Sequence, residues 1–286
     1  GALSGSAANL VLAFAGTVTE HTGTVTITDA PTLAQLVTIN AETTGAITLN
    51  DASANYSGSA ANLVLAFAGT VTTHTGTVTV TDALSVTNAN TIDAATSGVI
   101  TASITDDATD LATLTGTGNN YTITFGNTDA ASLAELVTIN AATTGALTLN
   151  ALTVAANLSG SSANLTSAFA GTVTTHTGTV TLTDAPTVAQ LVSINAASTG
   201  AITLNVTNGA LSGSAANLVL AFAGTVTEHT GTVTITDAPS VAQLVTINAE
   251  TTGAITLSTA DGALSGSAAN LVLAFAGTVT EHTGTV

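Results

Sequence analysis

One short alternating phrase dominates the hydrophobic pattern of the chain. In residues 21–30 a Thr-Gly turn is followed by Thr, Val, Thr, Ile and Thr, so hydroxyl and branched apolar side chains alternate. Alternation with a period of two is typical of a half-buried β-strand. We therefore predict a strand in which Val25 and Ile27 face a core, while Thr24, Thr26 and Thr28 face water.

The phrase recurs throughout the chain, and a shorter relative at residues 42–49 lies between copies. Aligning the phrase Leu-Ser-Gly-Ser-Ala-Ala-Asn-Leu gives the unit starts Leu3, Tyr56, Leu158, Leu211 and Leu264, and a divergent unit begins near Ile104. Each unit contains two matching halves, and the turns alternate between spacings of about 22 and about 31 residues, a range typical of repeat architectures. Such self-similarity indicates a repeat array rather than two ordinary domains.

Each half-unit holds further candidate elements. Residues 16–19 in the long repeats and 36–40 in the short repeats are candidate strands, and the Ala- and Leu-rich segments 7–15 and 31–36 predict a short helix or 3₁₀ turn. Independent hairpins, as across residues 17–28, are the alternative. The favoured prediction is an all-β protein with short helical turns. It is a parallel β-solenoid, or β-helix, of about eleven coils that form one continuous array over residues 1–286.

The two ends of the chain are related to each other. Residues 262–286 repeat residues 1–25 without a change. Terminal repeats of such arrays normally carry polar caps, and neither end has one. We interpret the chain as a window on a longer array, or as a building block whose copies stack head to tail through a non-closing interface.

Composition limits both the core and the partners. Hydrophobic residues make up 45% of the chain but aromatic residues only 3%, and Cys is absent. A core of Ala, Val, Ile, Leu and Thr suits thin stacked layers. Without Cys, disulfide frameworks and thiolate metal sites are excluded.

The charge is entirely acidic. There is no Lys or Arg against 17 Asp and Glu, which gives a formal net charge of −17. Neutralising phosphates requires cationic side chains, so nucleic-acid binding and polybasic attachment to a membrane surface are excluded. The apolar runs are also far shorter than the roughly 20 residues that span a bilayer, so we expect no membrane insertion.

Five histidines occupy one position of the repeat, namely His21, His74, His176, His229 and His282. In the predicted solenoid, equivalent rings would lie about 9.6 Å apart, which is twice the strand spacing. That separation is too large for two rings to share one metal ion. The sequence therefore predicts an exposed turn residue that is copied with its repeat.

A second column is acidic and consists of Asp29, Asp82, Asp129, Asp184 and Asp237. Calcium suits carboxylates that have no basic partners, but a turn or a helix cap explains the column better. The densest acidic cluster lies in the divergent unit and comprises Asp106, Asp107 and Asp110. These three residues are the metal-site candidates, with calcium as the ion, and no other cofactor is expected.

The remaining polar residues suggest a surface rather than a reaction. Rows such as Thr24, Thr26 and Thr28 form a hydroxyl array that suits a sugar or ice surface, although Thr is also an ordinary solvent-facing strand residue. An active site is a single preorganised constellation, whereas residues copied five times are usually scaffold. We therefore expect no enzymatic activity.

Three segments carry a resemblance to a known class of proteins. Residues 57–63, 90–98 and 114–117 resemble the Thr-, Ala- and Gly-rich tandem repeats of very large secreted bacterial surface proteins, including cyanobacterial and marine ones. The resemblance implies export and a structural or adhesive role at the cell surface or in a matrix, with no catalytic residues. We expect a structural building block of an extracellular fibre, filament or layer whose partners are copies of itself. The alternative is an adhesin stalk or a Thr-face module for polysaccharide or ice, stiffened by calcium.

Overall fold

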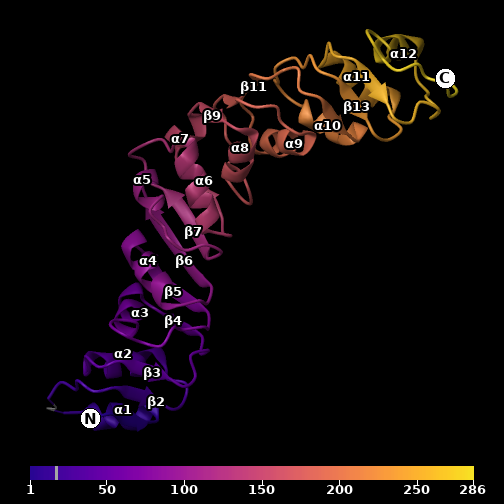
Figure 1. Ribbon diagram of the computed structural model, residues 1–286. Helices are drawn as coiled ribbons and strands as arrows, with labels where there is room; N and C mark the ends of the chain where they lie inside the picture. Colours follow the sequence, from indigo (N-terminus) through magenta and orange to yellow (C-terminus); the bar gives the residue numbers. More distant parts are fainter. Residues whose placement is uncertain (17–18) are drawn as a thin grey trace. The chain divides into compact units, whose positions relative to one another are not determined.

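Helices and short strands alternate along the chain in the computed structural model, which describes residues 1–16 and 19–286 (Figure 1). This part of the chain contains twelve helices and four small parallel sheets. The all-β prediction is therefore wrong, and so is the β-solenoid. The described residues form a mixed α/β fold in which about a third of the chain is helical, and they contain no solenoid or closed sheet.

The chain divides into two compact units. Unit 1 comprises Gly1–Thr128 and Ala141–Thr148, and unit 2 comprises Asp129–Asn140 and Leu149–Val286. The helices of unit 1 are α1 (Ala7–Phe14), α2 (Leu33–Ala41), α3 (Ala60–Ala66), α4 (Val86–Ala95) and α5 (Ala108–Leu111). Its strands are β1 (Leu3–Gly5), β2 (Val25–Ile27), β3 (Ile47–Leu49), β4 (Tyr56–Gly58), β5 (Val78–Leu84), β6 (Ile100–Asp106), β7 (Asn120–Phe125) and β8 (Leu147–Thr148).

The strands of unit 1 pair in chain order. One sheet has the order β1-β2-β3 and the other β4-β5-β6-β7-β8, all parallel. In the first sheet Leu3 pairs with Val25 and Val25 with Ile47, so equivalent positions of successive half-units lie side by side. Figure 1 shows α1 to α4 on one side of strands β2 to β5, as expected when each crossover between parallel strands contains a helix.

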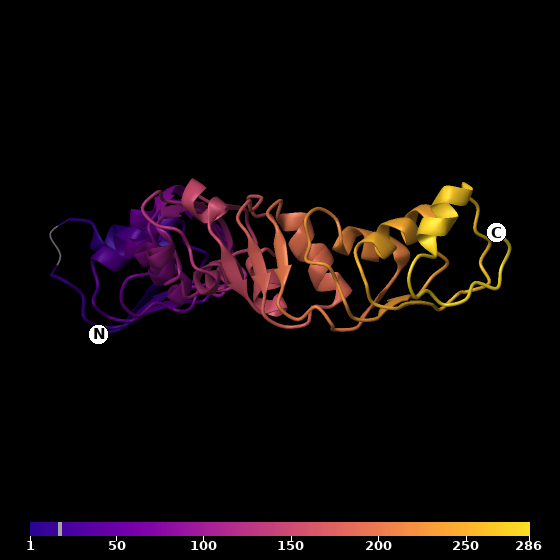
Figure 2. The same ribbon diagram turned by 90° about the horizontal axis from the view of Figure 1, so that it is seen from above.

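Unit 2 repeats this arrangement. Its helices are α6 (Leu133–Ala142, of which the last two residues belong to unit 1), α7 (Ala151–Ala155), α8 (Ser162–Ala168), α9 (Val188–Ala197), α10 (Ala215–Ala221), α11 (Val241–Ala249) and α12 (Ala268–Ala274). Its strands are β9 (Leu158–Gly160), β10 (Val180–Leu182), β11 (Ile202–Leu204), β12 (Leu211–Gly213), β13 (Val233–Ile235) and β14 (Ile255–Leu257). They form two three-stranded parallel sheets. In Figure 2 the orange-to-yellow helices lie along one edge and the extended segments along the opposite edge.

Local capping explains why helices replace the predicted second strands. The candidate strand 36–40 lies inside α2, where Thr32 and Gln35 form a capping box. Such a box satisfies N–H groups at the helix start that would otherwise lack partners. The candidate at 16–19 includes residues 17 and 18, which lie outside the described residues. Its equivalents Val71, Val226 and Val279 form only isolated parallel bridges.

The prediction of which side chains of strand β2 face the core is confirmed. Val25 and Ile27 are fully buried, while Thr24 and Thr28 are exposed and Thr26 is half-buried. The phenylalanines at the ends of α1, α3, α8 and α10 are also buried, namely Phe14, Phe67, Phe169 and Phe222. The alternation therefore gives the strand faces correctly, although it does not give the fold class.

The Thr-Gly turns stack on one another within each unit. A Cβ atom on Gly45 would collide with the carbonyl oxygen of Gly23, and Gly200 has the same relation to Gly178. The recurring glycine therefore permits a close approach of two backbones. This contact is the physical reason for the most regular feature of the sequence.

Candidate functional site

The histidine column joins neighbouring half-units, and its three internal members, His74, His176 and His229, are buried, whereas His21 and His282 are half-buried. His74 and His229 are at most 2% exposed. Nε2 of His74 lies 2.6 Å from the carbonyl oxygen of Ala54, and its Nδ1 lies 3.1 Å from Oγ1 of Thr96. His229 makes the equivalent contacts with Gly209 and Thr251. The prediction of an exposed turn residue is therefore wrong.

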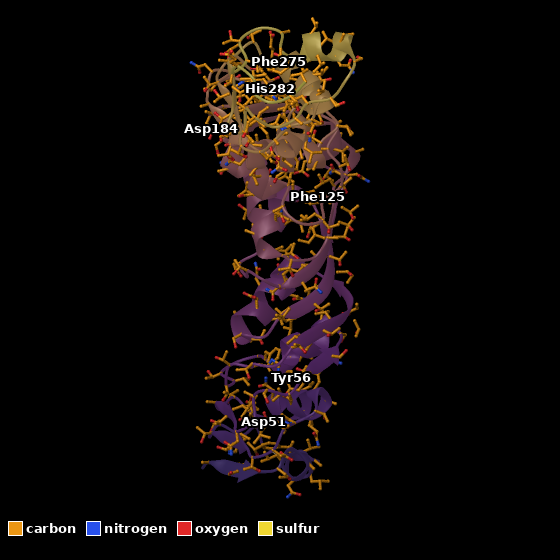
Figure 3. The ribbon with its side chains drawn as sticks, turned by 90° about the vertical axis from the view of Figure 1, so that its right-hand side faces the viewer. Asp51, Tyr56, Phe125, Asp184, Phe275 and His282 are labelled. Carbon is orange, nitrogen blue, oxygen red and sulfur yellow. The ribbon has the colours of Figure 1, made fainter. Side chains whose placement is uncertain are left out.

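Aromatic rings complete the environment of each imidazole. The ring of His74 stacks on Tyr56 at 4.6 Å and lies 5.4 Å from Phe67. The pair Phe275 and His282, labelled in Figure 3, repeats the second contact at 5.8 Å. The histidine of each long repeat therefore packs with the phenylalanine that ends the preceding helix, and the two form one cluster.

Burial changes the protonation of these groups. It lowers the pKa of His74, His176 and His229 below the usual value, because a charged ring would lose its hydration. It also raises the pKa of Tyr56 to about 12, with a smaller contribution from the charge of Asp51. All four side chains are therefore neutral at pH 7.

The aspartate column binds helix starts. Oδ1 of Asp29 accepts a 2.7 Å hydrogen bond from the N–H of Ala7, the first residue of α1. The same 2.7 Å bond occurs between Asp82 and Ala60, Asp184 and Ser162, and Asp237 and Ala215. A carboxylate at a helix N-terminus also interacts favourably with the helix dipole. The helix-cap interpretation holds for these four residues, and each of them caps the helix of the preceding half-unit.

The fifth member of the column, Asp129, differs from the others. It is half-buried at the start of unit 2, and its backbone carbonyl accepts a 2.8 Å hydrogen bond from Nδ2 of Asn150. In this region Thr153 takes a comparable role, because its Oγ1 accepts from the buried N–H of Ala131 in the preceding half-unit.

An asparagine column that sequence reasoning missed binds helix ends. Nδ2 of Asn195 in α9 lies within 3.3 Å of the carbonyl oxygens of Leu220, Ala221 and Ala223 at the end of α10. The last carbonyls of a helix lack partners within the helix and are often bound by cationic side chains. Here an amide serves instead, in a chain without Lys or Arg. The equivalent residues are Asn40, Asn140 and Asn248. Because these asparagines recur at one position of the repeat, the sequence could have indicated a structural role for them.

The contact between α4 and the turn at Asn119 departs from the repeat. Asn119 stands where the other units have histidine, since it bridges Thr143 as His74 bridges Thr96. Its Nδ2 donates to Oδ1 of Asp93 at 2.8 Å, and its Oδ1 accepts from the N–H of Ile100 at 2.9 Å. The pair borders an open polar hollow of about 330 Å³. The sequence shows that the turn spacing is irregular near Asn119, but it did not indicate that Asn119 pairs with Asp93.

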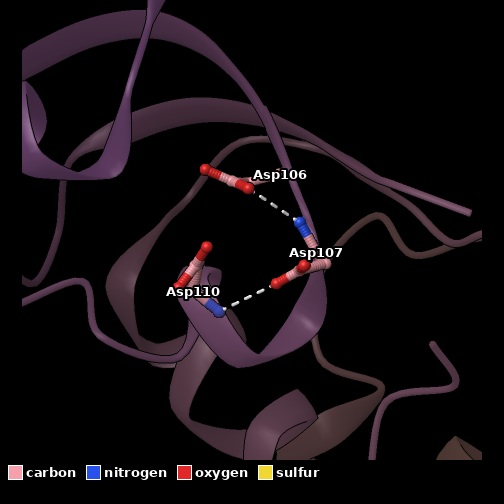
Figure 4. Close-up of side chains that lie close together, drawn as sticks. All are labelled: Asp106, Asp107 and Asp110. Atoms are coloured by element: carbon pink, nitrogen blue, oxygen red, sulfur yellow. Dashed lines mark hydrogen bonds between the residues drawn. The ribbon is translucent and has the colours of Figure 1, made fainter. Parts of the chain in front are cut away.

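The predicted metal candidates do come together (Figure 4). Asp106, Asp107 and Asp110 each place a carboxylate oxygen within 4.8 Å of the others. Asp107 caps α5 by accepting from the N–H of Asp110 at 3.2 Å, and Asp106 accepts from the N–H of Asp107 at 3.0 Å. The oxygens are of the type that Ca²⁺ prefers, but the cluster also has this local capping role.

The hydroxyl rows lie in register on the outer sheet faces. Each strand contributes one central Ser or Thr, and the paired sets are Ser4 with Thr26 and Thr48, Ser57 with Thr79 and Thr101, Ser159 with Thr181 and Thr203, and Ser212 with Thr234 and Thr256. They are exposed or half-buried. Neighbouring strands set their spacing at roughly 4.8 Å.

Comparisons with known proteins suggest no function for this chain, so a functional proposal has to rest on the contacts described above. No family model matches the chain, and no curated protein or solved structure is significantly similar to it. Among the described residues, no helix has both the length and the apolar character that crossing a bilayer requires.

Proposed function

We propose that this chain is a structural repeat protein of a cell surface or extracellular matrix, and that its partners are copies of itself. One observation carries the proposal. The side chains best suited to chemistry, the buried histidines and the aspartates and asparagines of the repeat, bind backbone groups of neighbouring half-units. Groups used in this way serve cohesion, and the proposal assigns the chain no reaction.

An exposed leucine supports the choice of partner. Leu12, Leu65, Leu220 and Leu273 occupy the same position on α1, α3, α10 and α12, and each is more than half exposed. Recurrent exposed apolar side chains are typical of surfaces that meet another protein. The helix α8 carries Ser167 at this position, so a polar residue is compatible with the fold.

Sedimentation measurements test this proposal. In about 0.15 M NaCl, which screens much of the repulsion between acidic surfaces, the wild-type chain is expected to form assemblies that grow with concentration. A variant carrying Leu12→Ser, Leu65→Ser, Leu220→Ser and Leu273→Ser, which extends the serine of α8 to the equivalent helices, is expected to remain monomeric with an unchanged circular dichroism spectrum. A wild-type chain that stays monomeric at all concentrations would refute the proposed partner.

The hydroxyl rows support a second candidate, a binding module for polysaccharide or ice. The supporting observation is the register of Ser and Thr on parallel strands, such as the exposed Ser212 and Thr256 on either side of the half-buried Thr234. Replacing Thr203 and Thr256, both exposed, by Lys is expected to abolish retention on insoluble polysaccharide or inhibition of ice recrystallisation while preserving self-association. This candidate is rejected if the variant is still retained on polysaccharide and still inhibits ice recrystallisation.

A further inference from the structure

We propose that the buried histidines form an acid-sensitive device which loosens the packing between half-units when the pH falls below about 6.5. The proposal rests on the position of each ring at a junction, by which we mean the contact between two neighbouring half-units. The backbone N–H of His74 donates to the carbonyl of Ala95, and its carbonyl accepts from the N–H of Ser97 at 2.8 Å. Its ring nitrogens contact Ala54 and Thr96. One residue thus connects a preceding segment and a following turn.

The hydrogen-bond partners define the neutral form of the ring. A carbonyl oxygen only accepts, so Nε2 of His74 carries the hydrogen that is donated to Ala54. Nδ1 is then unprotonated and faces the hydroxyl of Thr96. That hydroxyl oxygen already accepts from the N–H of Gly98 at 3.0 Å. A second proton on the ring would therefore meet a hydroxyl, without a carboxylate to balance the new charge.

Among the described groups that contact the ring of His74, Tyr56 is the one that titrates, and the carboxylate of Asp51 contributes to its raised pKa. Tyr56 stacks on the ring and remains neutral, and the other faces are formed by Phe67, Ala54 and Thr96. Aromatic faces attract a cation and offset part of the cost of burying it. The remaining cost of an unpaired buried charge favours opening of the junction over charging within it.

The other two buried rings have related surroundings. His229 follows the exposed Glu228, and its N–H donates to the backbone carbonyl of Glu250, whose side chain is half-exposed. Phe222 covers its ring, and Gly209 and Thr251 bind its nitrogens.

His176 lies among uncharged groups. It packs on Phe169, its N–H donates to the carbonyl of Ala197, and Thr175 precedes it in the chain. Burial lowers the pKa of His176 even though the backbone carbonyls of Ala156 and Thr153 favour its charged form. Charging this ring would therefore place a cation in a buried position that has no carboxylate beside it in the described contacts.

The direction of the pH effect follows from the difference between the folded and unfolded states. The unfolded chain binds protons on histidine near pH 6.5, whereas the folded chain binds them only at lower pH. The contribution of these residues to stability is therefore complete above pH 6.5 and is lost as the pH falls below it. Carboxylates titrate near pH 4, so the range from about 6.5 to 5 isolates the histidine effect.

The divergent unit supplies an internal control. Asn119 occupies the histidine position, its carbonyl accepts from the N–H of Thr144 at 2.7 Å, and its amide side chain does not titrate. The junction at Asn119 therefore shares the backbone geometry of the junction at His74 but lacks the acid-sensitive group.

Amide hydrogen exchange tests the proposal on the intact chain. Protection factors, corrected for intrinsic exchange rates, are measured at pH 7 and pH 5 for Ser97, Thr252 and Thr144, whose N–H groups donate to His74, His229 and Asn119. We expect Ser97 and Thr252 to lose protection at pH 5, by about tenfold for each unit by which the folded pKa lies below 6.5. Thr144 should keep its protection.

A variant locates the effect within one junction. In His74→Gln, the pH dependence should disappear at Ser97 and persist at Thr252. If this variant fails to fold, the comparison of Ser97 with Thr144 in the wild-type chain still decides the question. The proposal is overturned if all three amides change equally, which would indicate a global effect of acid, or if none of them changes.

Discussion

Single residues in this chain are defined by what they bind in a neighbouring half-unit. His74 binds Ala54 and Thr96, Asp237 binds Ala215, and Asn195 binds the end of α10. The sequence shows that such residues recur, and recurrence alone led to a helix-cap prediction for Asp and an exposed-turn prediction for His. Only the first holds, because burial of a polar ring depends on partners that lie far away in sequence.

Asn195 gives a direct test of the missed column. Asn195→Ala removes three hydrogen bonds to carbonyls at the end of α10, and we expect it to lower the free energy of unfolding by about 1–3 kcal/mol. Asn217→Ala is the control, because Asn217 is exposed on α10 itself and should change stability by less than about 0.5 kcal/mol. Urea titration measures the free energy of unfolding of both variants. Equal losses in the two variants would show that Asn195 does not cap α10.

The acidic cluster predicts a response to calcium. Three carboxylates within 4.8 Å repel one another, so Ca²⁺ binding should raise the melting temperature and chelation should lower it. Asp110→Asn should remove the response, whereas Asp261→Asn, at an exposed acid outside the cluster, should retain it. An unchanged melting profile with and without chelator would exclude calcium as a structural component.

At the scale of elements, strand faces were predictable and element types were only partly so. Alternation correctly placed Val25 and Ile27 in the core. Residues 36–40 failed as a strand because the Thr32 and Gln35 capping box begins a helix, and a short apolar run does not distinguish the two structures. The parallel pairing of equivalent strands in successive half-units was correctly indicated by the repeat spacing.

The glycine of the turn is the element-scale prediction. Gly45→Ala directs a methyl group at the carbonyl of Gly23, and overpacking of this kind typically costs about 1–3 kcal/mol. Gly5→Ala is the matched control, because its Cβ would make only an ordinary contact with Leu10. Thermal denaturation should show a much lower melting temperature for Gly45→Ala and little change for Gly5→Ala. Equal melting temperatures would mean that the turns do not stack closely.

At the scale of the whole molecule, the composition of the chain explains how its helix ends are bound, whereas its topology could not be predicted from the sequence. The absence of Lys and Arg explains why asparagine amides, rather than cationic side chains, bind the carbonyl groups at the helix ends. The repeating unit was visible in the sequence, whereas the alternation of helices with short parallel strands was not. The reason is that Ala- and Leu-rich segments fit a helical layer as well as they fit a β-layer.

The central claim is that the polar columns hold equivalent half-units together, so that one whole repeat unit is exchangeable for another. Deleting residues 211–263 joins Ala210 to Leu264, a junction identical in sequence to that of Ala210 with Leu211. A deletion of residues 211–252 is the out-of-phase control.

Thermal unfolding followed by circular dichroism is the measurement. The account predicts that the in-phase deletion keeps a cooperative transition within about 5 °C of the wild type, and that the shorter out-of-phase deletion melts much lower. Loss of structure in the in-phase variant, or equal stability of the two variants, would contradict it.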